Sequence, residues 1–305
     1  MMTVTEQKRE QFLAFVQQVL AGDTAVKGVI AIGSMATGHM RPDSDIDAII
    51  FLDPFDYFVV PAEAIWDAQT DTFHSIFTDD PQLQQQGLQL DIARLDWQQW
   101  SNPDFVWPEG RCAELSTGWI AYDPDGTVAQ LIAARTAYPD ELRLQRLDES
   151  ITWLDQHLSD DTPEIHWQNL GPIIAHDRLQ AAYDYLVAAL FAYNRHWRIW
   201  RNREMQYLLK LPWLPDQFAE RVLVAANAPH LDHEGYKQRV EMLRSLFADL
   251  LQQLIANGDY SHAAIDQAFI RMHDEPGRAW NMDEWRKFRL VRQMTITGID
   301  EASLQ

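Results

Sequence analysis

Two aspartates separated by a single residue open an apolar segment of the chain, and a Gly-Ser pair precedes them with ten residues in between. Gly33-Ser34 follows the apolar run at 29–32, and Asp45 and Asp47 lead into the apolar run at 48–52. Short apolar runs rich in β-branched residues and bounded by turn residues predict buried strands. Because side chains alternate faces along a strand, we expect both aspartates to point the same way.

Two carboxylates on one face of a strand need a cation nearby. They repel each other, and burying each costs several kcal/mol unless a positive charge lies between them. Mg²⁺ prefers carboxylate and phosphate oxygens. A glycine lets the backbone approach a phosphate closely, and the N–H groups that open a helix favour an anion. Each motif alone is more often a turn or a solvated face, but the combination predicts a metal–triphosphate site.

A third carboxylate follows on a later predicted strand. Residues 88–95 predict a strand in which Asp91 interrupts the apolar residues, and burying that carboxylate would be costly without a cation. We choose Asp91 over Asp96, because Asp96 lies at the strand end, where an exposed carboxylate is ordinary. The alternative, an edge-strand aspartate that faces water, stays open.

Gly33-Ser34 together with residues 41–47 resembles the signature of the DNA-polymerase-β-like nucleotidyltransferases. The small-molecule members, which modify aminoglycosides and lincosamides, are the most similar. The resemblance implies that Gly33, Ser34 and Ser44 contact the nucleotide phosphates. It also implies that Asp45, Asp47 and Asp91 bind Mg²⁺ and are the catalytic residues.

That resemblance implies transfer of a nucleoside monophosphate, AMP from ATP, onto a hydroxyl of a small acceptor, with release of pyrophosphate. Two alternatives remain open. One is a protein nucleotidyltransferase or antitoxin that modifies a partner protein, and the other is a degenerate relative that senses nucleotide without turnover.

Composition restricts the class of protein. The chain has 305 residues, 47% of them apolar, one cysteine and a net charge of −20. This length and composition predict a globular protein with two domains. The sequence shows no membrane span and no signal-peptide core, so we expect a cytoplasmic protein. Such acidity disfavours nucleic acid as a partner and favours a small cationic acceptor, although acidity also serves solubility. The oligomeric state stays open.

The predicted fold class is α+β, with a boundary near Tyr138. Residues 1–138 should form the nucleotidyltransferase catalytic domain, a mixed sheet with helices, and residues 139–305 an all-helical domain that binds substrate or nucleotide.

Within the first part we expect helices at 5–20, 61–76 and 127–137, the last of them capped by Thr127. Glu63 and Asp67 would lie one turn apart on the second of these helices, either lining the acceptor site or facing solvent. We also expect a loop at 97–108, a turn at 109–110 and a strand at 115–122. In the second part the apolar period predicts helices that include 140–158, 173–196 and 218–226.

The helical part contains four arginines and two tryptophans within residues 194–203. Arginine binds phosphate through two parallel hydrogen bonds. We expect Lys210, with Arg201 or Arg203, to neutralise the nucleotide phosphates. The alternative is that these arginines pair with surface carboxylates.

Overall fold

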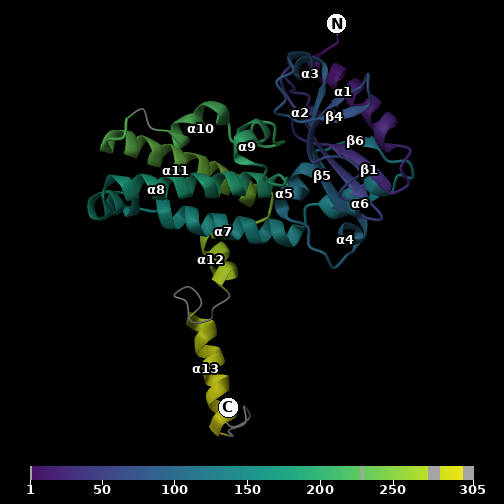
Figure 1. Cartoon of the computed structure of the whole chain (residues 1–305). Helices are drawn as coiled ribbons and strands as arrows, with labels where there is room; N and C mark the ends of the chain where they lie inside the picture. The colour runs from purple at the N-terminus through teal and green to yellow at the C-terminus, as the bar shows by residue number, and fades with distance from the viewer. Residues whose placement is uncertain (1, 228–229, 274–281, 298–305) are drawn as a thin grey trace. The chain divides into compact units, whose positions relative to one another are not determined.

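The computed structural model describes residues 2–227, 230–273 and 282–297. It divides into two compact units (Figure 1). The first unit comprises Met1–Ala137 and Trp197–Trp200, and the second comprises Tyr138–His196 and Arg201–Gln305.

The first unit is built on a mixed sheet of six strands in the order β4-β3-β5-β2-β1-β6. Strands β2 and β5 are parallel, and the other neighbours are antiparallel. This architecture, followed by a largely helical unit, confirms the α+β fold class. The strands are β1 (Val26–Ala31), β2 (Ile46–Leu52), β3 (Glu63–Asp67), β4 (Thr72–His74), β5 (Leu88–Asp96) and β6 (Trp119–Tyr122).

Helices cover both faces of this sheet. On one face α1 (Val4–Phe15) and the π-helical turn η1 (Val16–Leu20) bury Phe12 and Phe15 against Ile50. On the other face Ile49 packs with residues of α4 (Trp97–Ser101), α5 (Glu109–Ser116) and α6 (Thr127–Thr136). The alternation of Ile49 and Ile50 therefore joins the two cores through one strand.

Residues 63–74 form a β-hairpin, so the helix predicted at 61–76 is wrong. Strand β3 pairs with β4 through Ile65 and His74 and with β5 through Ile65 and Gln89. Ile65 and Trp66 are buried, and Trp66 joins the core under α1. An isoleucine and a tryptophan fit a pleated, half-buried surface, and here the partner strand decides the conformation.

Three other details of this unit differ from expectation. Residues 97–101 form a short helix instead of a loop, and Glu109 begins helix α5 instead of a turn, so β6 starts only at Trp119. Thr127 does not cap α6. The Asp123 carboxylate accepts the Val128 and Ala129 N–H groups at 3.3 and 2.8 Å, which satisfies the helix start from outside the helix.

The second unit consists of helices and the segments that connect them, with no strand among its described residues. Its longest helix is broken at Gly171, whose φ of 82° lies in the left-handed region, and Pro172 follows. The predicted helix from residue 173 is the part beyond that break. The helices are α7 (Asp140–Leu158), α8 (Thr162–Tyr193), α9 (Arg201–Leu208), α10 (Phe218–Ala226), α11 (His233–Ala256), α12 (Ala264–His273) and α13 (Met282–Thr297).

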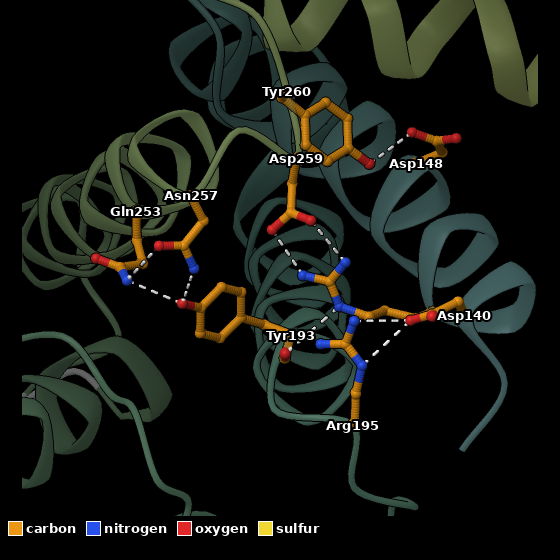
Figure 2. A network of polar contacts seen from close by, with 9 residues as sticks. Asp140, Asp148, Tyr193, Arg195, Gln253, Asn257, Asp259 and Tyr260 are labelled. Atoms are coloured by element: carbon orange, nitrogen blue, oxygen red, sulfur yellow. Dashed lines mark hydrogen bonds and ion pairs between the residues drawn. The ribbon is translucent and has the colours of Figure 1, made fainter. Parts of the chain in front are cut away.

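Two buried charges of the second unit, those of Arg143 and Asp148, are paired. The Arg143 guanidinium, 6% exposed, donates to both oxygens of Asp259 at 2.8 and 2.7 Å. Tyr260 donates its hydroxyl to Asp148 at 2.6 Å, and Arg271 binds the same carboxylate. Figure 2 shows the contacts of Asp259 and the bond from Tyr260 to Asp148. In the described part of the chain, no helix combines the length and apolar character that crossing a membrane requires.

Candidate active site

The Gly-Ser turn lies directly beside the first strand that carries an aspartate. The Ile32 N–H donates to the Asp47 carbonyl at 2.9 Å, which extends the pairing of β1 with β2 to the last residue before the turn. Gly33 opens the short helix α2 (Gly33–Thr37) with a φ of 60°, a conformation that favours glycine. Ser34 follows and is 6% exposed. The fold thus brings Gly33-Ser34 next to Asp47.

Three carboxylate residues form a row across the sheet. Asp91 on β5 is paired with Asp47 on β2 on one side and with Glu63 on β3 on the other. Residues paired in this way point to the same face, and adjacent strands are about 4.8 Å apart. Asp45 precedes β2 by one residue and lies two positions before Asp47. The structure therefore brings the predicted Asp47 and Asp91 together and adds Glu63.

The exposure of these residues corrects one argument from the sequence. Asp45 and Asp47 are half-buried, but Asp91 is exposed. The predicted cost of burying Asp91 is therefore wrong, and its place in the row is what supports a role. Asp96 caps α4, where its carboxylate accepts the Gln98 N–H at 3.1 Å.

Glu63 is a site residue that sequence reasoning placed on a helix. Its position beside Asp91 follows only from the hairpin. Two short runs prone to β structure, at 63–67 and 72–74, enclose a polar turn that contains Asp71 with a φ of 53°. That pattern is the signal that could have indicated a hairpin.

The row fits a hard divalent cation in chemistry, because carboxylate oxygens are the donors that such ions prefer. Within residues 2–227, 230–273 and 282–297, no three His, Cys, Asp or Glu side chains are gathered closely enough to hold a metal. The backbone pairs Asp47 with Asp91, and the side chains would have to turn toward a shared ion. Metal binding by Asp45, Asp47 and Asp91 therefore stays a prediction.

Helix α1 fixes the segment that follows the Gly-Ser turn. The Arg9 guanidinium donates to the carbonyls of Met35 at 2.7 Å and Ala36 at 3.2 Å. The Thr5 hydroxyl accepts the Met40 N–H at 3.2 Å. These bonds attach α2 and the residues after it to α1, and so fix the position of the first turn of α2.

Lys8 brings a cation to the other end of the same segment. Its ammonium donates to the Ser44 carbonyl at 3.2 Å. Burial lowers the pKa of Lys8, and the nearby charges of Asp45 and Asp43 oppose that shift. The Ser44 hydroxyl accepts the Arg41 N–H at 3.0 Å and so closes the turn. Nothing in the sequence singled out Lys8, and nucleotide contact by Ser44 stays a prediction.

The predicted phosphate-binding cations belong to the second unit. Arg201 and Arg203 lie on α9, and Lys210 is exposed just after it. Arg201 forms an ion pair with Asp184 at 3.0 Å, as the surface alternative expected. Contact of these three residues with nucleotide stays a prediction.

Comparison with known proteins relates part of the chain to a protein family. Residues 9–98 match the family described as nucleotidyltransferase domain. No curated protein matches the sequence. A crystal structure of a nucleotidyltransferase-like protein from Exiguobacterium sibiricum 255-15 is similar over 97% of this chain and 92% of its own, with 12% identity and a TM-score of 0.39. At that TM-score the structural likeness supports no argument, so the assignment rests on the family match and the signature.

The matched segment contains the Gly-Ser turn and all four acidic residues of the site. The first unit therefore carries a nucleotidyltransferase domain. It belongs to the polymerase-β-like nucleotidyltransferase superfamily, as the signature predicted.

Proposed function

We propose that the first unit binds a nucleoside triphosphate with Mg²⁺ and transfers the nucleoside monophosphate, AMP from ATP, to a hydroxyl of a small molecule such as an aminoglycoside or lincosamide. Pyrophosphate is the second product. The observation that carries this proposal is the register of the sheet, which sets Asp47 between the Gly-Ser turn and Asp91. A triphosphate bound at the Gly-Ser turn and an acceptor bound at Asp91 would then lie on the two sides of Asp47.

Each residue has a role that follows from its place. Gly33 and Ser34 approach the triphosphate with backbone N–H groups and the serine hydroxyl. Asp45 and Asp47 hold the cation, and bound Mg²⁺ supplies positive charge that offsets the charge on the reacting phosphate. Asp91, one strand away, accepts a hydrogen bond from the attacking hydroxyl and takes its proton. Positioning and charge neutralisation are most of what nucleotidyl transfer requires.

Charge supports a small cationic acceptor. The net charge of −20 opposes binding of a polynucleotide, whose phosphates need lysine and arginine partners. Asp91 and the exposed Glu63 make the acceptor side of the row acidic. An acceptor that carries ammonium groups is attracted to such a surface.

The test is a screen for pyrophosphate release with Mg²⁺, in which ATP, GTP, CTP and UTP are each combined with aminoglycosides, lincosamides and other polyols. We expect release with ATP and at least one of these acceptors. Asp45→Asn should abolish it without unfolding the protein. Asp43→Asn is the matched control, because Asp43 lies in the same turn but pairs with Arg41 at the surface. Full activity of Asp45→Asn would contradict the metal assignment.

A further inference from the structure

A hydrophilic pocket lies between the β3–β4 hairpin and helix α3 (Pro81–Gln86). Its volume is about 430 Å³, which lies within the range of small-molecule sites. The hairpin and the helix both belong to the first unit, as do the carboxylates of the row. The lining residues that matter here are Asp67, Thr70, Thr72, His74, Gln82 and Gln86.

The pocket opens on the face of the sheet that carries the carboxylate row. Glu63, Ile65 and Asp67 are alternate residues of β3, so their side chains point to the same face of the sheet. Ile65 is paired with His74 and Asp67 with Thr72, so the β4 residues of the pocket share that face. Glu63 and Asp67 are four residues apart on one strand, which is a separation of about 13 Å. Strand β3 thus connects the pocket to Asp91.

The lining groups suit a ligand with many hydroxyl and ammonium groups. The Asp67 carboxylate accepts the Gln69 N–H at 2.9 Å and the Thr70 hydroxyl at 2.8 Å, and these bonds lower its pKa, so it is charged at neutral pH. Thr70 and Thr72 are 2.6 Å apart, and Thr72 contacts His74 at 2.9 Å. Hydroxyls and side-chain amides both donate and accept hydrogen bonds.

We propose that this pocket binds the unmodified end of the acceptor, a molecule with several hydroxyl and ammonium groups, while its reacting hydroxyl reaches Asp91 past Glu63. This inference rests on the proposed function, since Asp91 is where the reaction would occur. Glu63 lies between the two ends and contributes a second carboxylate for an ammonium group. The site is specific to the hairpin and α3, and nothing in the signature motif implies it.

The test uses the full chain and three soluble probes: neomycin with hydroxyl and ammonium groups, maltotriose with hydroxyls only, and spermine with ammonium groups only. Calorimetry should show that neomycin binds most tightly. Gln82→Ala combined with Gln86→Ala should weaken neomycin at least tenfold. Gln85→Ala is the matched control, since it lies on the same helix, is exposed and does not line the pocket. Alanine is a strong helix former, so α3 should persist in all variants.

Two results would overturn the pocket. One is that none of the three probes binds, and the other is that neomycin binds equally to the wild type and the Gln82/Gln86 variant. Titration of the same proteins with Mg²⁺ and ATP distinguishes failure of the pocket proposal from failure of the proposed function. ATP binding that is intact in every variant, with an unchanged neomycin affinity, would refute the pocket alone. Absence of ATP binding in the wild type would refute the proposed function itself.

Discussion

The two units differ in whether the charged residues compared here are buried and paired or exposed and unpaired. In the second unit Arg143 and Asp148 are 6% and 5% exposed, and each is bound by partners of opposite charge or by a hydroxyl. In the first unit Asp91 and Glu63 are adjacent, exposed and of like charge. Among the residues that the structure describes, neither forms an ion pair. The first arrangement stabilises a core, and the second leaves acidic groups available to a ligand.

Like charges in directly paired strand positions lower stability. The row Asp47, Asp91 and Glu63 contains two such pairs. A sheet with this arrangement is less stable at the place where the proposed cation would bind. Natural proteins depart from the rules of stability mostly at functional sites. The comparison therefore predicts that substitutions in the row change activity and those in the buried network change stability.

Asp47→Asn should give the largest effect. We expect Mg²⁺-dependent transfer to fall at least about 1,000-fold, which corresponds to about 4 kcal/mol of barrier, because the cation loses its central ligand. The variant should remain folded, because asparagine has nearly the size and shape of aspartate. Pyrophosphate release and thermal unfolding together check this. A variant that keeps its activity but melts at a clearly lower temperature would reverse the comparison.

Arg143→Met should have the opposite effect, a loss of stability. Removing one partner of a buried pair leaves Asp259 without its cation, and the free energy of unfolding should fall by about 3 kcal/mol. Arg146→Met is the control on the same helix, because the ion pair of Arg146 with Glu149 is 38% exposed on each side. That variant should lose less than about 1 kcal/mol. Urea unfolding measures both, and equal losses would count against the role of burial.

His157 gives the second unit a pH dependence. The imidazole is 6% exposed and packs beside the rings of Trp153 and Tyr185, and burial, with the charges of Arg178 and His166, lowers its pKa from 6.5 to about 4. Between these values the unfolded chain binds more protons than the folded one, so acidification destabilises the fold. We expect a loss of about 2 kcal/mol from pH 6.5 to pH 4.5.

His157→Phe tests this dependence, because phenylalanine keeps a ring but does not titrate. The stability of the variant should vary less with pH over that window than the stability of the wild type. His262→Gln is the control, because His262 is exposed. A wild type whose stability rises on acidification from pH 6.5 would contradict the assignment.

Arg41→Ala should have the smallest effect. The ion pair of Arg41 with Asp43 is 76% and 75% exposed, so solvent screens it. We expect a stability change below about 0.5 kcal/mol that diminishes further with added salt. Thermal unfolding at low and high salt measures it, and a change above about 1 kcal/mol would show that the signature turn is held by this pair.

The sequence was sufficient where a local pattern decides the structure. Helix α7 at 140–158 and helix α10 at 218–226 have the bounds that their apolar period predicts. The spacing of Gly33-Ser34 and Asp45-x-Asp47 indicated the turn and the strand that follows it, because both depend on residues close in sequence.

Prediction was wrong where a distant partner decides the structure. Residues 63–66 are paired with residues 88–91 of β5, more than twenty positions away in the chain, and the apolar spacing of 61–76 alone also fits a helix. The place of Glu63 beside Asp91 depends wholly on that pairing. The Asp123 cap of α6 was likewise missed, because it comes from outside the helix that it satisfies.

A crystal structure with Mn²⁺ and a non-hydrolysable ATP analogue tests the central claim most directly. We predict an anomalous peak bound by carboxylate oxygens of Asp45 and Asp47, with the triphosphate on the backbone of Gly33 and Ser34. An analogue bound away from this turn, or an ion held by other residues while Asp45 and Asp47 face solvent, would contradict the account.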